Sequence, residues 1–488
     1  MKKTLISGAG VLTLVGFLSK ILAALYRFPY QNMVGDKGFY AFQQVYPFYS
    51  IITTLSLVAL PNFLSSLRHT SQEADEMIKK RETQQFFQTS FLFSLASVIL
   101  LSILCQPLAQ LMGQPKLALP LLMAISPIIL VPFLSLYRGL AQSKNDMTKS
   151  AISQMVEQVV RVVLIILAAF MFTRLTDDVY TISFLAMLGS FIGGLAALIY
   201  LIRSTNFKFK GLFTDLTDWQ MKKEIIRKFG LASLIFTFFM IYMLIFQMVD
   251  VFFVKNALVH SGISSSHAEI LKGIYDRGQP FLQLGLVITT AILTDALPKM
   301  TQGGHISKQI VDAVTYLSIA LTVGLVLVLP EMNDVLFKSH TQALSLQLFI
   351  MQIPIISMIQ LAHHELFLRG HHKISGAILL VGLLFKLLLV YPLTVTFGLA
   401  GASISSLISL LIVLVAYQSY RRRLPKQVLN LRFWLAILVM SAVVLLGKKL
   451  FDVSEHRVLQ LIELLLLTAA GAATFFSIFR MKNIRELL

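Results

Sequence analysis

The sequence contains few charged residues for its length. Of its 488 residues, 14% are Asp, Glu, Lys or Arg, whereas soluble globular domains contain about 25%. Hydrophobic residues make up 56% of the chain, and the mean hydropathy is +0.76. A water-soluble fold of this size needs more polar surface than this composition supplies. The sequence therefore predicts an all-α polytopic membrane protein.

Cysteine is almost absent, because the chain has only Cys105, which lies inside an apolar run. A single cysteine excludes a disulfide framework and a cysteine-based metal site. Two histidine pairs, His363–His364 and His371–His372, lie near the inner end of one predicted span. They have no matching cluster of carboxylates, so we interpret them as interfacial residues instead of zinc ligands. We predict no metal and no cofactor.

Acidic residues are also scarce, with 24 Asp and Glu against 42 Lys and Arg, for a net charge of +18. Nucleic-acid binding would require a basic patch on a folded soluble face. Here the basic residues lie in short connections between apolar runs, which is typical of cytoplasmic loops in membrane proteins. We therefore predict a membrane-lipid environment and no nucleic-acid partner.

Long polar loops are missing as well. The longest outer connection, residues 251–272, has 22 residues, which leaves no room for the catalytic domain of a membrane glycosyltransferase or polymerase. The sequence also lacks a recognisable cluster of acid, base or metal ligands. These absences disfavour an enzyme of lipid-linked glycan assembly, and we predict that the protein is not an enzyme.

Apolar runs dominate what remains, and a helix needs about 20 residues to cross the hydrocarbon core of a bilayer. Runs of that length predict fourteen transmembrane helices, at about 5–25, 40–66, 86–110, 117–137, 151–173, 179–202, 229–250, 274–297, 309–330, 343–368, 374–396, 398–420, 433–451 and 458–479.

The distribution of basic residues predicts an orientation. An even number of spans puts both termini on one side, and 28 of the 42 Lys and Arg residues then lie on that side. Cytoplasmic loops are enriched in these residues, so we expect both termini in the cytoplasm. The start, MKKTLISGAG, resembles a signal peptide but lacks a small-residue cleavage site, and we expect a retained first span.

Two sequence echoes indicate an internal repeat. Arg138-Gly139 before the fifth span matches Arg369-Gly370 before the eleventh, and each is followed by a cation at comparable depth, Arg161 and Lys386. GFYAFQQVYPFYSIITTLSLVALP of the second span also resembles GIYDRGQPFLQLGLVITTAILTDALP of the eighth. Such repeats are common in transporters. They predict two pseudo-symmetric six-helix lobes, residues 1–225 and 226–430, followed by a helix pair at 431–488.

Several ionisable residues lie within the predicted spans, where a charge costs roughly 3 kcal/mol or more and usually faces a cavity or a partner. Glu157 and Arg161 are four residues apart on one helix, so they can pair. Lys386 has no acidic residue within a turn of its own helix, which favours contact with an anionic substrate over snorkelling or pairing with another helix. Asp276 and Arg277 open the eighth span, either as an interfacial ion pair or with Asp276 orienting Arg277 toward a substrate.

Three stretches carry a family resemblance: GFLSKILAALYRFPYQNMVGDKGFYAFQQVYPFY, YRGLAQSKNDMTKSAISQMVEQVVR and GIYDRGQPFLQL. The chain resembles the multidrug/oligosaccharidyl-lipid/polysaccharide exporter superfamily, in the polysaccharide-transporter branch of SpoVB-like proteins and MurJ-type lipid II flippases. The resemblance implies two lobes around a cavity that opens alternately to either side. It also implies a polyprenyl-pyrophosphate-linked glycan as substrate, with the last two spans accommodating the lipid tail.

The resemblance also implies functional residues. Lys20 and Arg27 are similar to the family's basic pair in the first span, and Arg277 is similar to its basic residue in the eighth. The chain departs from MurJ proteins in several places, including the Lys20–Arg27 spacing, which is one residue longer, and Lys386, where some relatives have polar or acidic residues. Phe28 follows Arg27 where an acid is common, and Ile51 and Ile52 replace expected arginines. These departures place it nearer the SpoVB-like branch.

Together these features predict a flippase of the bacterial cytoplasmic membrane that moves an undecaprenyl-pyrophosphate-linked sugar by alternating access. Lipid II for peptidoglycan is the leading substrate, and teichoic-acid, capsule and exopolysaccharide units are alternatives. A drug/cation antiporter and a scaffold for the cell-wall synthesis machinery, itself a candidate partner, are further alternatives. The predicted substrate-binding and supporting residues are Lys20, Arg27, Arg161, Arg277 and Lys386, with Glu157, Asp276 and Gln279.

Overall fold

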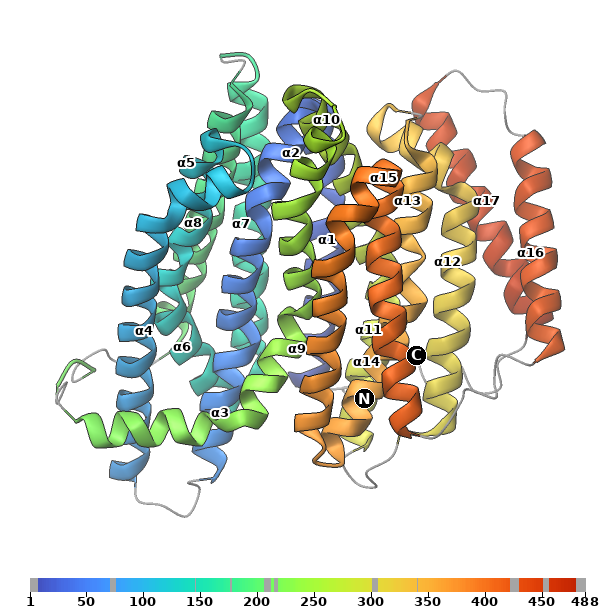
Figure 1. The fold of residues 1–488 in the computed structure, drawn as a ribbon. Helices are drawn as coiled ribbons and strands as arrows, with labels where there is room; N and C mark the ends of the chain where they lie inside the picture. The colour runs from blue at the N-terminus through green and yellow to red at the C-terminus, as the bar shows by residue number, and fades with distance from the viewer. Residues whose placement is uncertain are drawn as a thin grey trace. The chain divides into compact units, whose positions relative to one another are not determined.

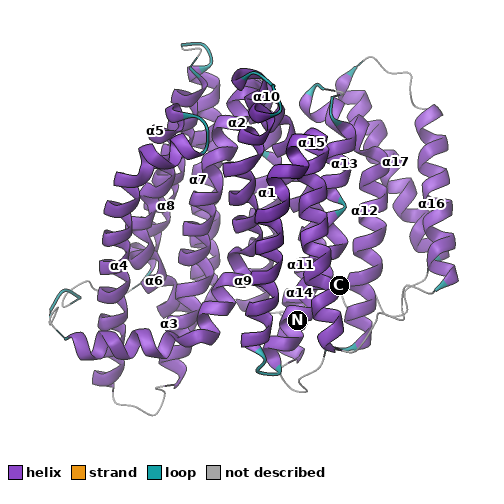
Figure 2. Cartoon of the chain, in the orientation of Figure 1, coloured by secondary structure: helices purple, strands orange, loops and turns teal. Residues whose placement is uncertain are grey.

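The computed structural model describes residues 8–70, 76–144, 146–175, 178–205, 212–214, 218–300, 306–339, 341–421, 430–450 and 456–479. Throughout these ranges the chain is helical, with short connections and no strand (Figure 2). This confirms the predicted all-α class. The chain divides into two compact units, Met1–Asn256 and Ala257–Leu488. The finer division at residues 225 and 430 remains a prediction.

The described part of the first unit contains α1 to α8, nearly all of α9 and three short helical segments (Figure 1). These are α1 (Gly8–Leu25), α2 (Arg27–Thr54), the π-helix η1 (Leu55–Ala59), α3 (Leu60–Thr70), α4 (Glu76–Leu111), η2 (Pro115–Leu117), α5 (Ala118–Ile125), η3 (Ser126–Leu130), α6 (Val131–Ser143), α7 (Met147–Phe172), α8 (Val179–Ser204) and α9 (Trp219–His260), whose last residues belong to the second unit.

The second unit continues with eight helices. These are α10 (Ser265–Asp276), α11 (Gly278–Met300), α12 (Lys308–Phe337), α13 (Ala343–Ile350), α14 (Gln352–Leu368), α15 (His372–Arg421), α16 (Leu431–Leu450) and α17 (Arg457–Ile478). The last two helices pack on each other and on α12. Their shared core contains Tyr316, Phe433, Phe475 and Phe479.

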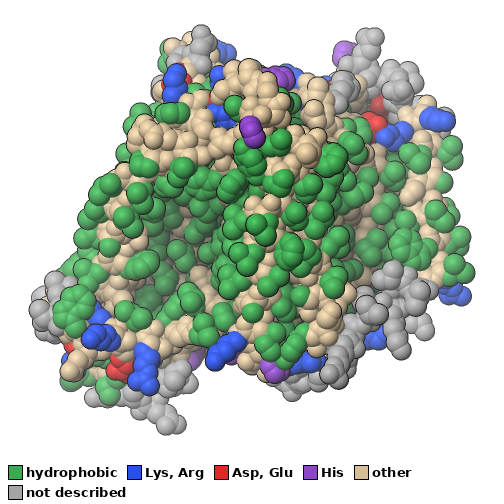
Figure 3. Space-filling view, in the orientation of Figure 1, with side chains coloured by type: hydrophobic (Ala, Val, Ile, Leu, Met, Phe, Trp, Pro, Cys, Tyr) green, Lys and Arg blue, Asp and Glu red, His purple; other side chains and the backbone are tan. Residues whose placement is uncertain are grey.

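Eleven helical segments of the described chain are long and apolar enough to cross a membrane. Two of them, Val15–His69 with 55 residues and His372–Tyr420 with 49, are much longer than the roughly 20 residues that one crossing needs. Each of these two segments is therefore long enough to cross the membrane more than once. The count of fourteen transmembrane helices stays a prediction. On the face drawn in Figure 3, hydrophobic side chains cover the middle of the helices, while charged side chains gather toward the helix ends.

Close packing of α7 against α8 depends on glycine. Gly189 and Gly193 lie four residues apart on α8, and a Cβ at Gly193 would approach the Glu157 backbone oxygen to 2.7 Å and the Arg161 Cβ to 3.2 Å. Small residues at this spacing let the backbones of two membrane helices approach each other. The two glycines therefore place the charged part of α7 directly against α8.

The start of α8 is fixed by a capping residue outside the membrane segment. The Asp178 carboxylate accepts hydrogen bonds from the Thr181 backbone N–H at 3.3 Å and from its hydroxyl at 2.6 Å. Partial burial by itself raises the pKa of Asp178, but these hydrogen bonds, that of the Tyr180 N–H and the charge of Lys116 outweigh it and lower the pKa below its usual value.

The first part of α9 is turned away from its membrane segment at Gly230, whose φ of 59° is favourable mainly for glycine. In Figure 1 this part runs across the lower ends of α3 and α4. It is held there by two ion pairs, Arg81 to Asp218 at 2.7 Å and Lys228 to Glu82 at 2.8 Å. The first part of α9 and the residue before it are therefore held against α4 of the first unit.

Candidate functional site

An aromatic cluster from the start and middle of α2 forms the candidate site of the first unit. Tyr30 and Phe42 have ring centroids 4.8 Å apart, Phe42 and Tyr46 5.8 Å, and Tyr46 and Tyr49 6.1 Å. Tyr26, which precedes α2, meets Phe42 edge to face at 6.3 Å. All five side chains are buried.

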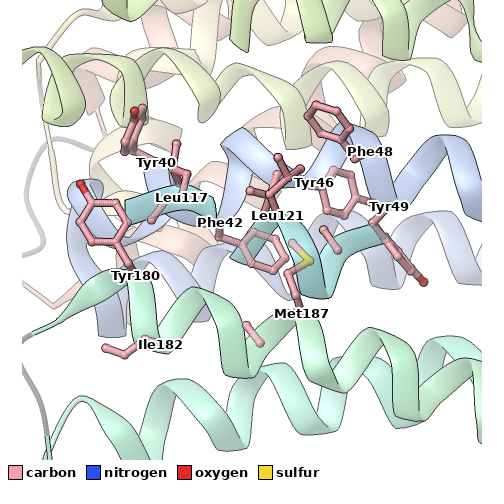
Figure 4. Packing of buried hydrophobic residues seen from close by; sticks show 14 of the residues in the cluster. Tyr40, Phe42, Tyr46, Phe48, Tyr49, Leu117, Leu121, Tyr180, Ile182 and Met187 are labelled. Atoms are coloured by element: carbon pink, nitrogen blue, oxygen red, sulfur yellow. The ribbon is translucent and has the colours of Figure 1, made fainter. Parts of the chain in front are cut away.

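Neighbouring helices close around this cluster. Figure 4 shows Tyr46, Phe48 and Tyr49 of α2 together with Leu121 of α5 and Met187 of α8. These buried side chains belong to one hydrophobic core that also includes residues of α4 and α7. The core keeps the α2 rings in place, so they form a fixed aromatic wall.

Two of the predicted cations, Arg27 and Arg161, lie against this wall. The guanidinium carbon of Arg27 is 4.4 Å from the Tyr46 ring centroid, and that of Arg161 is 5.9 Å from the same centroid. Arg161 also lies 5.6 Å from the Tyr26 ring and 5.0 Å from the Tyr49 ring. The structure thus brings together two cations that are 134 positions apart in the sequence.

Both arginines are buried without an acidic partner. Arg27 is 0% exposed and Arg161 is 2% exposed. Within the described ranges, no carboxylate forms an ion pair with either, and no group accepts a hydrogen bond of normal geometry from the Arg27 guanidinium. Arg161 donates a hydrogen bond to the Gln158 side-chain oxygen at 2.8 Å. Cation–π contacts return only about 0.5–2 kcal/mol each, whereas a buried unpaired ion costs several kcal/mol.

The Glu157–Arg161 pair suggested by their spacing is wrong. Glu157 Oε2 instead accepts a hydrogen bond from Arg138 of α6 at 2.7 Å, and both side chains are buried. The Tyr49 hydroxyl donates to Glu157 Oε1 at 3.4 Å. Arg138 on a neighbouring helix therefore neutralises Glu157, and Glu157 does not compensate the positive charge of Arg161.

The remaining predicted cation of the first unit, Lys20 on α1, is exposed. No hydrogen bond or ion pair joins Lys20 to another residue in the part of the chain that the structure describes. Its helix packs mainly on α7, the helix that carries Arg161. Lys20 is thus the accessible member of the three basic residues.

In the second unit, Arg277 lies at the break between α10 and α11. It is 1% exposed, donates to the Asn333 side-chain oxygen at 3.2 Å and lies 5.1 Å from the Phe337 ring centroid, so α12 holds it from the side. Asp276 forms an ion pair with Lys272 of α10 at 2.5 Å. Gln279 is buried in the first turn of α11.

Lys386 is 0% exposed and lies between the two halves of α15. Its ammonium donates to the hydroxyls of Ser405 at 3.1 Å and Ser406 at 2.6 Å. The helix pair is thereby tied together at the depth where the sequence echo places the counterpart of Arg161.

The two histidines of α14 take part in hydrogen bonds. His363 Nδ1 lies 2.7 Å from the Ser375 hydroxyl and 3.3 Å from the Tyr417 hydroxyl, and His364 Nδ1 bonds the Gln360 carbonyl oxygen at 2.7 Å. Over the described ranges, no group of three or more His, Cys, Asp or Glu side chains has the arrangement of a metal site.

Comparison with known proteins shows which family the chain belongs to. Residues 5–304 match the model of a family described as polysaccharide biosynthesis protein. The chain belongs to this family. It is 33% identical over 96% of its length to the uncharacterized membrane protein YabM of Bacillus subtilis (strain 168), covering 91% of that protein. It is also 21% identical to the lipid II flippase MurJ of the same strain, over 80% of this chain and 78% of MurJ.

Solved structures show the same fold for this member of the polysaccharide biosynthesis protein family. A lipid II flippase MurJ in an inward closed conformation matches with a TM-score of 0.70 at 15% identity, over 96% of this chain and 98% of that one. A multidrug resistance MATE transporter of the MOP superfamily matches with a TM-score of 0.62 at 14% identity, over 83% and 94%. The chain is therefore a multi-pass membrane protein with the fold of the MOP superfamily, as the sequence resemblance implied.

Sequence reasoning missed the aromatic residues of the site and the role of Arg138. A signal for the aromatics was present, because Tyr46 and Tyr49 are three residues apart and so share one face of a helix. The partner of Glu157 left no such signal. It comes from a different helix, 19 positions earlier.

Proposed function

We propose that this protein is a flippase that moves an undecaprenyl-pyrophosphate-linked sugar precursor from the inner to the outer leaflet of the cytoplasmic membrane, with lipid II as the leading substrate. The family match and the similarity to the lipid II flippase MurJ support a transporter of lipid-linked glycans. As in those relatives, the protein would act by transport and not by catalysis.

One observation carries the proposal: Arg27 and Arg161 are buried on a shared tyrosine, and no acidic residue of the described chain pairs with either of them. A site that holds two uncompensated cations in a low-dielectric environment favours a multiply charged anion, such as a pyrophosphate. A drug/cation antiporter would need the opposite charge at such a site. The nearby acid, Glu157, is already neutralised by Arg138.

In the proposed cycle, the anionic head group enters the protein while the polyprenyl tail stays in lipid. Lys20, which is exposed, makes the first contact, and Arg27 and Arg161 then bind the pyrophosphate. Because both arginines are enclosed in this conformation, binding requires the site to open, which fits an alternating-access cycle. Arg277 and Lys386 supply two further cations in the second unit, supported by Asp276 and Gln279.

The orientation with both termini in the cytoplasm and an association with the cell-wall synthesis machinery are parts of the same proposal. A second substrate class is supported by the name of the matched family, polysaccharide biosynthesis protein. On that alternative, the transported head group is a teichoic-acid, capsule or exopolysaccharide unit on the same polyprenyl pyrophosphate.

The test is flipping by the purified protein in liposomes, with fluorescent lipid II and other polyprenyl-pyrophosphate glycans as parallel substrates. We expect transport of at least one of them, and loss of that transport in the variant Arg27→Gln/Arg161→Gln. The matched control is Arg174→Gln, which removes one positive charge from an exposed side chain just after α7. Transport by the double variant at the parent rate would contradict the proposal.

A further inference from the structure

The carboxylate of Glu157 lies close to the proposed anion site but is held away from its cations. Glu157 and Arg161 are one helical turn apart on α7. Tyr49 contacts both of them, because its hydroxyl is 3.4 Å from Glu157 Oε1 while its ring centroid is 5.0 Å from the Arg161 guanidinium carbon. One tyrosine therefore separates the buried acid from the cation that the acid would otherwise neutralise.

Arg138 is fixed by three groups, two from α7 and one from η1. Its Nη2 donates to Glu157 Oε2 at 2.7 Å, its Nε donates to the Ser153 hydroxyl at 3.0 Å, and its Nη1 donates to the Ser56 carbonyl oxygen at 3.3 Å. Ser56 belongs to the π-helix η1, and such single-turn π segments inside α-helices are frequent at functional sites. Arg138 is 0% exposed, so its position is set by these contacts.

We propose that Arg138 is a positioning residue whose charge keeps Glu157 from neutralising Arg161, and thereby keeps the anion site of the first unit cationic. This inference rests on the proposed function, because it assumes that Arg27 and Arg161 bind an anion. Without Arg138, Glu157 could reach Arg161 with a change of rotamer, since the two lie four residues apart on the same helix. An Arg161 paired in that way would no longer be available to the pyrophosphate.

A purely structural ion pair makes a different prediction. If Arg138 and Glu157 only held α6 and α7 together, removing either partner would leave a buried charge unpaired and would harm the protein in the same way. If Arg138 shields Arg161, the two partners have opposite effects on the anion site. Loss of Arg138 then weakens anion binding, whereas loss of Glu157 does not.

The experiment measures binding of undecaprenyl pyrophosphate to the full-length protein in detergent, with the folded fraction of each variant determined by size-exclusion chromatography. We expect Arg138→Gln to weaken binding by tenfold or more. Glu157→Gln should bind at least as tightly as the parent. The double variant Arg138→Gln/Glu157→Gln should return to within about threefold of the parent affinity, since no carboxylate remains to neutralise Arg161.

Further variants keep the test decisive if Arg138→Gln does not fold. Arg138→Lys retains the positive charge and should retain binding, and the double variant removes both charges of the Arg138–Glu157 pair together. Weak binding by a folded Glu157→Gln protein, or by a folded double variant, would overturn the inference and indicate a structural pair. Failure of the parent itself to bind undecaprenyl pyrophosphate would instead count against the proposed function, so the two failures are distinguishable.

Discussion

Replacing Arg161 with glutamine removes one of the two buried cations while keeping a polar side chain of similar reach. Arg161 makes cation–π contacts with three tyrosines and one hydrogen bond to Gln158, and among the described residues it has no acidic partner. The substitution therefore breaks no ion pair within the described chain. Its main consequence should fall on the binding of an anion.

The size of the effect follows from the contacts that a pyrophosphate would lose. A hydrogen bond to a charged group contributes about 1.5–3 kcal/mol, and about 1.4 kcal/mol corresponds to a tenfold change in affinity. The Arg161→Gln protein should therefore bind undecaprenyl pyrophosphate roughly 10- to 150-fold more weakly. An ion pair at 4 Å contributes about 4 kcal/mol at an effective dielectric constant of 20, which sets an upper limit.

The same substitution should change stability much less than binding. It removes an ion whose burial costs several kcal/mol, and it also removes three ring contacts of about 0.5–2 kcal/mol each. Because these contributions oppose each other, we expect the thermal unfolding midpoint to stay within about 5 °C of the parent value.

The assay pairs a binding titration with a thermal melt of the same purified sample, and Arg174→Gln serves as the matched removal of one exposed charge. Parent-like affinity in a folded Arg161→Gln protein would refute the reasoning. A large drop in the melting midpoint would also refute it, since that result would make Arg161 a structural residue.

Three further predictions address the helix packing, a helix cap and the second unit. Gly193→Val should lower the thermal unfolding midpoint, because a Cβ would lie 2.7 Å from an α7 backbone oxygen. The control Gly324→Ala should leave the midpoint unchanged, because no atom lies within 4 Å of its Cβ. Equal midpoints for the two variants would contradict the packing of α7 on α8. Asp178→Ala should cost about 1 kcal/mol at neutral pH. The pKa of Asp178 is lowered in the folded protein, so the stability that its cap contributes is present above the unfolded pKa of about 3.9 and is lost as the pH falls through the lower folded pKa. The melting midpoints of the parent and the variant should therefore converge in acid. A difference that stays constant with pH would refute the capping role of Asp178. Arg277→Gln/Lys386→Gln should slow flipping more than removal of two exposed loop charges, and parent-like flipping at normal expression would exclude a role for these two cations.

The fold class could be predicted from the sequence because each crossing is marked locally, by an apolar run and by the basic residues that flank it. Partners of buried charges depend on which helices pack together. The i,i+4 spacing of Glu157 and Arg161 indicated a pair, but Arg138 on α6 provides a closer and better-fixed partner. Tertiary packing therefore overrode a local rule at the candidate site.

For the buried cations too, the sequence indicated which residues were present, and the fold determined what they contact. Arg27 was identified through the family resemblance as one of a basic pair in the first span, and the structure encloses it on the Tyr46 ring. Lys386 was predicted as a substrate contact because no acid lies within a turn, yet Ser405 and Ser406 accept its hydrogen bonds. The presence of a cation within an apolar run could be read from the sequence, whereas the identity of the contacting group required the fold.

The central claim is that Arg27 and Arg161 recognise the pyrophosphate of a polyprenyl-linked substrate. The most direct test is the affinity of the parent and of Arg27→Gln/Arg161→Gln for three ligands with the same tail: undecaprenol, undecaprenyl phosphate and undecaprenyl pyrophosphate. For the parent, affinity should rise with each added charge, and for the double variant the three affinities should converge. Equal affinities in the parent, or an unchanged preference for pyrophosphate in the double variant, would contradict the account.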